Sequence, residues 1–506
     1  VCYRREKLIT ICTKHLRAND VIMSKINIKP CITNKPKIIH IGLGAFHRAH
    51  QALYTSELID KEKTLWSISS INLFGSVELI KELRQQDNVY AVLERGSNRE
   101  QVKISKSITH SLHPLLDGRE KVLETLADVN TAIVSLTITE KGYCIEPSSG
   151  TLDTNNPLIQ DDLKSAQSPK SAIGYIVEAL RLRKERQRPP FTVMSCDNIQ
   201  SNGDVARKAI LGYAKLVDSE LYEWIQDHVT FPNTMVDRIV PAVTPETLAY
   251  IESKLGYADH CAIACEPFRQ WVIEDNFVNG RPNWNEVGAE FVEDVIPYEQ
   301  MKLRMLNGSH SFLSYLGYLS GYKYISEVID DKEFLKATLD FMLAEQAPTL
   351  NLPSEVNIEQ YAKLLIERFS NNKLQHATSQ IATDGSHKLP PRFCESLIYN
   401  RSKRIQTHWL ELGIAAWMNY VIGTDDDGNS IEVNDPLSPI FDSIKSDCKS
   451  SRDSALALIN LECIFNESIT NDTELVNNII EKFISIQESG AKATLYRMAN
   501  KIDLNQ

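Results

Sequence analysis

The sequence predicts an α/β protein in which a parallel, helix-flanked sheet is followed by a mostly α-helical C-terminal domain. The first observation is a short apolar run, residues 37–41, that leads through a glycine-containing turn into a helical pattern over residues 49–59. The second is that further apolar runs of strand length follow, each succeeded by polar residues or a helical pattern. The third is that strand patterns fade from Tyr298 onward and helical patterns dominate. We therefore expect a leader over residues 1–23, an α/β domain over 24–290 and a helical domain over 291–506.

Length and composition are consistent with two or more globular domains. The chain has 506 residues, of which 42% are hydrophobic and 24% charged, and it carries a net charge of −11. A chain of this length exceeds one compact core. The acidic balance argues against a nucleic-acid partner.

The ten cysteines are scattered along the chain. Cys261 and Cys265 do not form a CxxC pair, and no second pair follows them, so we expect no metal site. Free cysteines in so long a chain fit a reducing cytoplasm. The longest apolar candidate, residues 412–422, is broken by Gly413 and Asn419, so we expect no membrane span. The leader lacks the apolar core of a signal peptide and is either an upstream extension or a poorly ordered tail.

The first strand and its turn have the setting that a dinucleotide fingerprint requires. Gly42 permits a tight turn, and Gly44 allows a pyrophosphate to approach the backbone at the start of the helix. We therefore interpret the first domain as a Rossmann-type dinucleotide-binding domain. Three further residues, Ile41, Ala45 and Phe46, complete the proposed cofactor segment. The third glycine of the usual pattern is replaced by His47, and the alternative is a purely structural turn.

The predicted second strand, residues 65–71, bears on the choice of cofactor. An acidic residue at its end would hold the ribose 2′-hydroxyl of NAD, but here the strand ends in Asn72. An asparagine can also hydrogen-bond a hydroxyl, and no arginine cluster is present to hold a 2′-phosphate. We expect NAD, with NADP less favoured.

Two further predicted strands end in polar residues that we expect at the cofactor. Residues 131–136 run into a polar loop that contains Thr137 and Glu140. Residues 191–195 run into Asp197 and Asn198. Ligands of open α/β sheets bind beyond the carboxyl ends of the strands. The Asn198 amide can donate to a developing alkoxide. The alternatives are a surface pair of Glu140 with Lys141, and an Asx-turn at Asp197.

The stretch from Tyr298 to His310 reads as a helix with three polar side chains on one side. At about 100° per residue, His310 lies about 80° and Asn307 about 140° round from Lys302. A lysine among leucines is costly to bury unless it is paired or neutral. Burial also lowers the pKa of a lysine and can make it a base near neutral pH. We hypothesise that Lys302 is a catalytic acid/base and that Asn307 and His310 hold the substrate oxygen. The alternative is a snorkelling lysine beside a core Asn and His.

The rest of the C-terminal half carries helical patterns, which we place at residues 302–319, 332–345, 358–368, 408–422, 453–461, 473–487 and 492–502. One proline-containing loop, residues 384–392, interrupts them. Its cations Lys388 and Arg392 suit an acidic substrate or a phosphate, and the alternative is a solvated interhelix loop.

Six of these segments together resemble the polyol-specific long-chain dehydrogenase family, also called the mannitol dehydrogenase family. The matching segments, in the order of the family, are residues 41–50, 137–143, 195–198, 235–241, 302–310 and 384–388. The combination of K-x-x-x-x-N-x-x-H with the G-x-G-x-F-H turn is highly specific. The leader before Met23 has no place in the family pattern.

The resemblance implies a metal-independent hydride transfer with NAD. It implies that Lys302 is the catalytic lysine, that Asn198 and Asn307 polarise the carbonyl oxygen, and that His310 orients the substrate. It also places Glu140 near the proton path, and Asp237 and Lys388 on the substrate side.

The resemblance also implies a small-molecule sugar acid or polyol as substrate. The sequence of residues 235–241, and Gly308 within residues 301–310, resemble the fructuronate reductase branch of the family more closely than the mannitol branch. That branch interconverts D-mannonate and D-fructuronate with NAD and NADH. Mannitol or arabinitol oxidation is the second possibility. We expect a cytoplasmic monomer or weak oligomer.

The sequence is also compatible with two other kinds of protein. A 6-phosphogluconate-type dehydrogenase also uses a lysine, but it requires a phosphate clamp of several cations that we do not find in the sequence. A dinucleotide-binding sensor without turnover belongs to another class, and it would not need the Lys302 amine.

Overall fold

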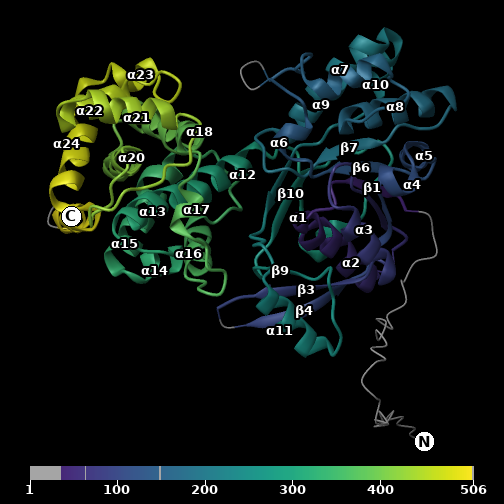
Figure 1. Cartoon of the computed structure of the whole chain (residues 1–506), viewed down its shortest axis with the longest axis horizontal. Coiled ribbons are helices and arrows are strands. Elements are labelled where there is room, and N and C mark those ends of the chain that lie inside the picture. Colours follow the sequence, from purple (N-terminus) through teal and green to yellow (C-terminus); the bar gives the residue numbers. More distant parts are fainter. Residues whose placement is uncertain (1–35, 63, 98, 147–149, 504–506) are drawn as a thin grey trace, which may run out of the picture.

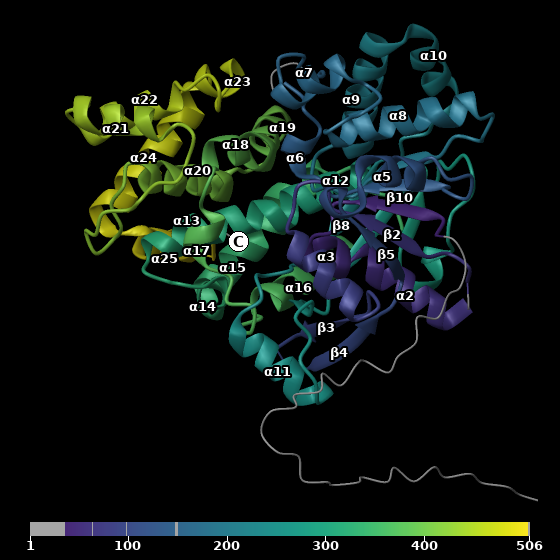
Figure 2. The same cartoon turned by 45° about the vertical axis from the view of Figure 1, so that its right-hand side comes forward.

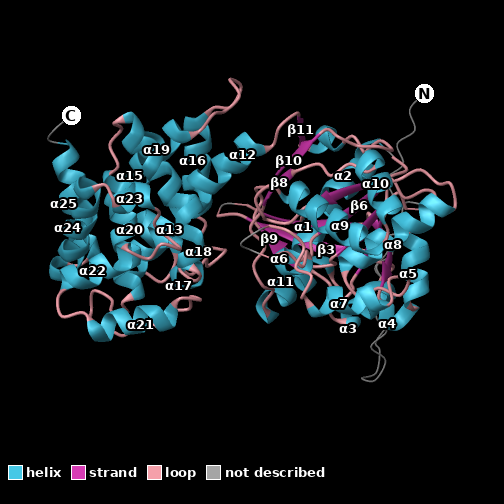
Figure 3. Ribbon diagram, turned by 90° about the horizontal axis from the view of Figure 1, so that it is seen from above, coloured by secondary structure: helices cyan, strands magenta, loops and turns pink. Residues whose placement is uncertain are grey.

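The computed structural model describes residues 36–62, 64–97, 99–146 and 150–503, arranged as an α/β part and a helical part that lie side by side (Figure 1). The expected leader, residues 1–23, lies outside the described residues. Seen from above, the described strands are confined to one part and the other part is helical (Figure 3). This confirms the predicted fold class, a Rossmann-like domain followed by a mostly helical domain.

A five-stranded parallel sheet forms the centre of the first part, with the strand order β5-β2-β1-β6-β7. Its strands are β1 (Ile38–Ile41), β2 (Ile68–Ile71), β5 (Ile108–Leu112), β6 (Ile133–Leu136) and β7 (Thr192–Ser195). Four of them were predicted within a few residues, because a strand buried on both faces reads as a continuous apolar run. In all four of these strands every residue is buried. The edge strand β5 was not predicted.

Helices cover both faces of this sheet. One face carries a core built with α5 (Arg119–Leu126), α8 (Ala172–Glu185), α9 (Asn202–Val217) and α10 (Ser219–His228). The other face packs on α2 (Gln51–Glu62) and α3 (Val77–Gln85). The remaining helices of this part are α1 (Ala45–Ala49), α4 (Pro114–Asp117), α6 (Thr139–Gly142), α7 (Pro157–Lys164), α11 (Pro245–Leu255) and the 3₁₀ turn η1 (Trp284–Val287). The helix expected over 49–59 is therefore α1 followed by α2, with a break at His50, whose φ and ψ are −113° and −96°.

Two three-stranded sheets extend the α/β part and were not predicted as sheets. One joins β3 (Tyr90–Arg95), β4 (Glu100–Ser105) and β9 (Ile263–Cys265). The other joins β8 (Thr234–Asp237), β10 (Gln270–Glu274) and β11 (Glu290–Val292).

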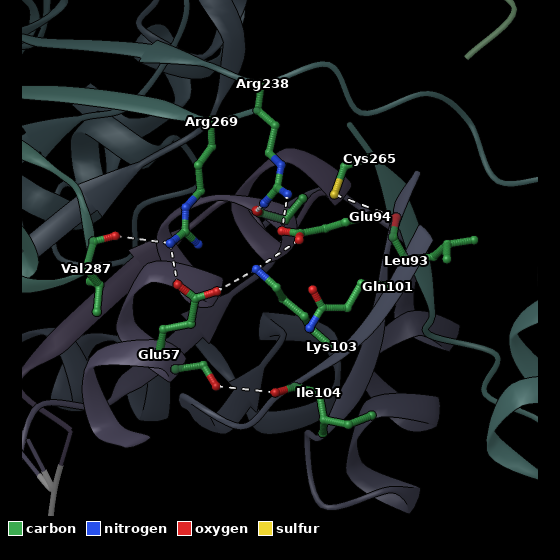
Figure 4. Close-up of polar contacts among 12 residues, drawn as sticks. Glu57, Leu93, Glu94, Gln101, Lys103, Ile104, Arg238, Cys265, Arg269 and Val287 are labelled. Carbon is green, nitrogen blue, oxygen red and sulfur yellow. Dashed lines mark hydrogen bonds and ion pairs between the residues drawn. The ribbon is translucent and has the colours of Figure 1, made fainter. Parts of the chain in front are cut away.

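A chain of ion pairs connects these two sheets to helix α2 (Figure 4). Glu57 accepts from both Lys103 and Arg269, Lys103 also contacts Glu94 at 2.9 Å, and Glu94 accepts from Arg238 at 2.5 Å. Charges of alternating sign satisfy one another here, which buried charges require. This series of ion pairs fixes Arg238, directly after the end of β8, which borders the site described below.

The helical part is built around α13 (Gly308–Leu319) and α20 (His408–Val421), which are buried almost along their whole length. Helix α12 (Ile296–Met301) leads from the α/β part into it (Figures 1 and 2). The other helices are α14 (Ile325–Asp330), α15 (Lys332–Asp340), α16 (Ile358–Phe369), α17 (Thr378–Ile381), α18 (Gly385–Leu389), α19 (Glu395–Lys403), α21 (Ser438–Asp447), α22 (Ser451–Ile459), α23 (Glu467–Thr470), α24 (Thr473–Ser489) and α25 (Ala491–Asp503). Four tighter or wider turns are η2 (Lys302–Asn307), η3 (Phe341–Gln346), η4 (Ala347–Thr349) and η5 (Pro390–Cys394).

The prediction of a loop over residues 384–392 is wrong, because α18 and the π-type turn η5 occupy it. Both prolines stand at the start of η5, where a missing N–H is tolerated best. The Asp435 carboxylate accepts from the Ser386 backbone N–H at 2.8 Å and from its hydroxyl at 2.6 Å, and so anchors the start of α18. This long-range contact was not visible in the local sequence.

Among the described residues, the structure contains no helix that is both long and apolar enough to span a membrane.

Candidate active site

A cleft of about 740 Å³ lies where the carboxyl ends of β1, β6 and β7 meet the first helices of the helical part. Most of the residues singled out in the sequence line it. They are Gly44, Ala45, Phe46, Thr137, Glu140, Asn198, Asp237, Lys302, Asn307 and His310. Five distant parts of the chain therefore converge here, and three of them follow β1, β6 and β7, as the carboxyl-edge rule for parallel sheets predicts.

Lys302 lies at the inner wall of the cleft and is only 7% exposed. Its Nζ donates to the side-chain oxygen of Asn198 and, at 2.8 Å, to the backbone oxygen of Val236. Burial lowers the pKa of the Lys302 amine, although the nearby Asp237 carboxylate opposes that shift. The amine is therefore held in one position and disposed to lose its proton.

The helix that carries Lys302 is not uniformly α-helical. Helix α12 passes into the π-helical turn η2, which begins at Lys302, and α13 begins after Asn307. The expected single α-helix was therefore wrong in this detail, because a π turn holds one more residue per hydrogen-bonded ring. Such turns occur often at functional sites. This one still brings Lys302, Asn307 and His310 to the same cleft.

The substrate side of the cleft is formed by Asn307 and His310. The backbone oxygen of Asn307 accepts from Arg392 Nη1 at 3.2 Å, which leaves the amide side chain at the cleft. The His310 ring lies 4.7 Å from the Phe369 ring and 5.1 Å from the His376 ring. Burial, together with the neighbouring His376, keeps the pKa of His310 well below its ordinary value, so the ring is neutral.

The glycine turn fits the close approach of a nucleotide. Gly42 has a φ of 112°, and a Cβ there would lie 2.0 Å from the Thr137 backbone oxygen, so only glycine is accommodated. A Cβ on Gly44 would meet no atom within 4 Å, so its backbone faces open space on the cleft side. The replacement at His47 is also explained, because this ring turns inward and stacks on His40 with centroids 3.4 Å apart.

Asp197 anchors the loop that follows β6, a role that sequence reasoning missed. Its carboxylate accepts from the backbone N–H groups of Ile138 and Thr139 at 3.0 and 2.9 Å, and from the Tyr143 hydroxyl at 2.7 Å. The expected polar loop thereby becomes the short helix α6, with exposed Glu140 at the cleft. The only signal in the sequence was an Asp that follows a buried strand, and this pattern is equally typical of an Asx-turn.

Asp237 lines the cleft, but its carboxylate already has a partner. Both of its oxygens accept from Arg368 of the helical part, at 2.7 and 3.0 Å. Arg368 was not among the predicted site residues, since an arginine in the last turn of an amphipathic helix carries no distinctive signal.

Three other predicted site residues, Ile41, Gly42 and Asn72, do not line this cleft. The Asn72 amide instead lies against Gly75, where a Cβ would come within 2.0 Å of its Nδ2. Lys388 does not line it either. Its Nζ donates to the backbone oxygens of Thr383 at 2.5 Å and Ile381 at 3.2 Å. Burial lowers the pKa of this amine.

Glu299, one turn before Lys302, was present in the analysed stretch but received no role. Its carboxylate accepts from the Ser201 backbone N–H at 2.9 Å. Burial raises the pKa of Glu299 to about 7. A group with such a pKa exchanges protons readily at neutral pH.

Within the part of the chain that the structure describes, no group of three or more His, Cys, Asp or Glu side chains is placed to hold a metal ion.

A parallel sheet with a glycine turn after its first strand, closed by a helical domain that brings a buried amine to the same cleft, defines a Rossmann-type oxidoreductase. Comparison with known proteins gives the family. The mannitol dehydrogenase Rossmann domain matches residues 36–286, and the mannitol dehydrogenase C-terminal domain matches residues 294–487. The chain belongs to the mannitol dehydrogenase family, as the sequence motifs indicated, and is an oxidoreductase that acts on CH–OH groups.

Several relatives span most of the chain. D-mannonate oxidoreductase of Escherichia coli (strain K12) is 51% identical over 458 residues, covering 90% of this chain and 94% of its own. Polyol:NADP oxidoreductase of Gluconobacter oxydans (strain 621H) is 37% identical and covers 79% and 83%.

Two solved structures have the same fold at substantial sequence identity. Pseudomonas fluorescens mannitol 2-dehydrogenase, in a ternary complex with NAD and D-mannitol, is 37% identical with a TM-score of 0.80, covering 93% of this chain and 96% of its own. A substrate-free D-sorbitol dehydrogenase is 36% identical with a TM-score of 0.85, covering 91% and 95%.

Proposed function

We propose that this chain interconverts a sugar acid and its 2-keto form with a nicotinamide dinucleotide, and that the reaction is D-mannonate + NAD = D-fructuronate + NADH. The observation that carries the proposal is the buried amine of Lys302, which contacts Asn198 at the end of the cofactor cleft. The substrate is inferred from the 51% identity to D-mannonate oxidoreductase.

The residues of the chain act on the reacting oxygen. When bound, the dinucleotide supplies or accepts the hydride. The open backbone at Gly44 and the loop beginning at Thr137 would hold it, since both line the cleft. Neutral Lys302 would take the hydroxyl proton during oxidation and return it during reduction.

Two amides and one imidazole would assist this proton transfer. The Asn198 oxygen is engaged by Lys302, so its NH₂ group is the donor directed at substrate, with the Asn307 side chain as the second donor. Hydrogen bonds aimed at charge that develops on the oxygen stabilise the transition state. His310, neutral because it is buried, would orient the substrate.

A sugar acid needs a cation or several donors for its carboxylate. Lys388 was expected to supply the charge, but its amine is directed to Ile381 and Thr383. Arg392 is the better candidate, because its guanidinium contacts Asn307 and Ser311 beside the cleft. Burial lowers the pKa of Arg392 to about 10, so the side chain is still a cation at neutral pH.

The substrate is tested directly by following NADH oxidation with fructuronate, tagaturonate, fructose and xylulose in parallel. We expect the highest kcat/KM with fructuronate. A preference for fructose or xylulose would reject the sugar-acid assignment and favour a mannitol or arabinitol 2-dehydrogenase. That second candidate is supported by the fold match to a complex with D-mannitol.

The same assay with NADPH tests the cofactor. We propose NAD, because the similar structure of Pseudomonas fluorescens mannitol 2-dehydrogenase contains NAD. The carboxyl end of β2 lacks an acidic residue that would repel a 2′-phosphate, and one relative is named for NADP. A higher kcat/KM with NADPH would overturn the choice.

We also propose a reducing, cytoplasmic location. The cysteines within the described residues are free, and five of them are buried: Cys144, Cys196, Cys261, Cys265 and Cys394. Buried thiols without disulfide partners fit a reducing compartment.

A further inference from the structure

Arg368, in the last turn of α16, inserts a cation from the helical part between two carboxylates of the α/β part. It donates to both oxygens of Asp237 at 2.7 and 3.0 Å, and to both oxygens of Glu266 at 3.0 and 2.8 Å. The guanidinium also lies 4.0 Å from the centre of the Phe268 ring. Its side chain is 4% exposed, and those of Asp237 and Glu266 are 6% and 2% exposed. Two bidentate contacts of this kind fix the guanidinium plane as well as its charge.

The residues that follow Arg368 make further contacts across the cleft. The Phe369 ring packs against His310, and Asn371 Nδ2 donates to the Arg95 backbone oxygen of β3 at 3.1 Å. The end of α16 therefore connects the substrate-side histidine with two strands of the α/β part. Arg368 itself does not line the cleft, but its partner Asp237 does.

The connection from Arg368 to the amine runs through β8. Asp237 is the partner of Arg368, and the preceding residue, Val236, accepts the hydrogen bond of Lys302. Four charged groups influence the amine: Asp237 and Glu299 favour the ammonium form, and Arg368 and Arg392 disfavour it. Because Arg368 pairs with Asp237, the last residue of β8, its charge offsets part of the effect by which this carboxylate favours the ammonium form of Lys302.

We propose that Arg368 is a positioning residue for the reaction: its paired contact with Asp237 holds the end of β8 against Lys302 and offsets the carboxylate charge, so that the amine releases its proton more readily. This inference rests on the proposed role of Lys302 as acid/base. It assigns to Asp237 the function of a counter-ion in place of the expected substrate contact.

The test is the pH profile of kcat/KM for sugar-acid oxidation in Arg368→Met, Arg368→Lys and wild type. In oxidation, kcat/KM rises with pH as Lys302 loses its proton, and this rising part of the profile is called the limb below. Loss of the cation leaves Asp237 uncompensated, so Arg368→Met should move the limb to higher pH by about one unit. At a pH below the limb this is about a tenfold loss in kcat/KM. Arg368→Lys retains the charge and should keep the limb near its wild-type position. The opposite variant, Asp237→Asn, should move it to lower pH.

A matched control is Arg401→Met, which removes an arginine that is ion-paired with Asp472 and Glu474 and does not line the cleft. It should leave the limb in place. If Arg368→Met and Arg368→Lys lower the thermal midpoint equally and neither moves the limb, Arg368 is only a structural contact and the proposal is wrong. If Arg368→Met does not fold, Arg368→Lys and Asp237→Asn still test it, and an unshifted limb in Asp237→Asn overturns it.

A second measurement does not depend on turnover. The rate at which acetic anhydride acylates Lys302, followed by mass spectrometry across pH, reports the protonation of this amine directly. We expect the same upward shift in Arg368→Met. An unshifted labelling curve overturns the inference about Arg368 even if the enzyme is active. A shifted curve in a protein that turns over no substrate of the panel would instead reject the proposed function, while the effect of Arg368 on the protonation of Lys302 would stand.

Discussion

The ε-amine of Lys302 donates a hydrogen bond to the side-chain oxygen of Asn198, 104 positions earlier in the chain. This contact joins the loop after β7 to the π turn η2, and so connects the cofactor sheet to the helical domain at the reacting centre. It also orients the Asn198 amide, because its oxygen is occupied and its NH₂ group is the part that faces the cleft. The proposed base and one proposed oxyanion donor are therefore positioned by each other.

Removal of the amine should abolish acid/base catalysis without abolishing cofactor binding. Lys302→Ala is expected to lower kcat by about 10²- to 10⁴-fold, the range that a positioned acid/base contributes. NADH binding, measured by fluorescence, should remain. The control is Lys61→Ala, an exposed lysine paired with Glu286, which should retain wild-type kcat. Undiminished turnover in Lys302→Ala would reject the assignment and favour a non-catalytic dinucleotide sensor.

Loss of a proposed oxyanion donor should affect the chemical step more than binding. Asn307→Ala is expected to lower kcat by about 10²- to 10³-fold with a small change in KM, because the hydrogen bond strengthens as charge develops. The comparison variant Asn285→Ala removes an exposed amide that donates to Glu286 at 3.5 Å, and should not change kcat. A rise in KM with unchanged kcat would show that Asn307 binds the substrate and the transition state equally strongly, which contradicts its role as an oxyanion donor.

The two glycines of the turn should respond differently to substitution. Gly42→Ala places a methyl group in collision with the Thr137 backbone at a φ of 112°, so it should lower the thermal midpoint and impair folding. Gly44→Val meets open space, so it should fold normally and weaken NADH binding by blocking the approach of the pyrophosphate. Differential scanning fluorimetry and NADH titration separate the two effects. Equal NADH affinity in Gly44→Val and wild type would contradict the cofactor placement.

The buried histidines beside the turn should make the fold sensitive to acid. Burial lowers the pKa of His40 and of His50 to about 3 and keeps that of His47 well below its ordinary value. The unfolded chain binds these protons at about pH 6.5, so their contribution to stability is complete above that pH and declines as pH falls toward 3. Each histidine can contribute a slope of about 1.4 kcal/mol per pH unit in that window.

Urea unfolding at pH 7.5 and pH 5.5 measures this loss. His50→Gln should reduce the difference between the two pH values, because it removes one titrating ring. His260→Gln changes an exposed histidine and should preserve the difference. Equal free energies of unfolding at both pH values in the wild type would show that these rings do not resist protonation.

The sequence by itself determined the fold class, the family, the glycine turn and four of the five central strands. It also identified Lys302, Asn198, Asn307 and His310 as one group, and the structure brings all four to one cleft. These features were readable because buried strands, the conformational freedom of glycine and helical spacing are properties of consecutive residues.

The tertiary structure alone decided which charges meet. Arg368 and Asp237 are 131 positions apart, Asp197 anchors a loop from a neighbouring strand, and Lys388 is directed away from the site expected for it. The smaller sheets, the π turn at Lys302 and the helical conformation of residues 384–392 were likewise not predicted. The physical reason is that a buried charge or polar group must be satisfied by whichever partner the packed fold brings near, and local sequence does not specify that partner.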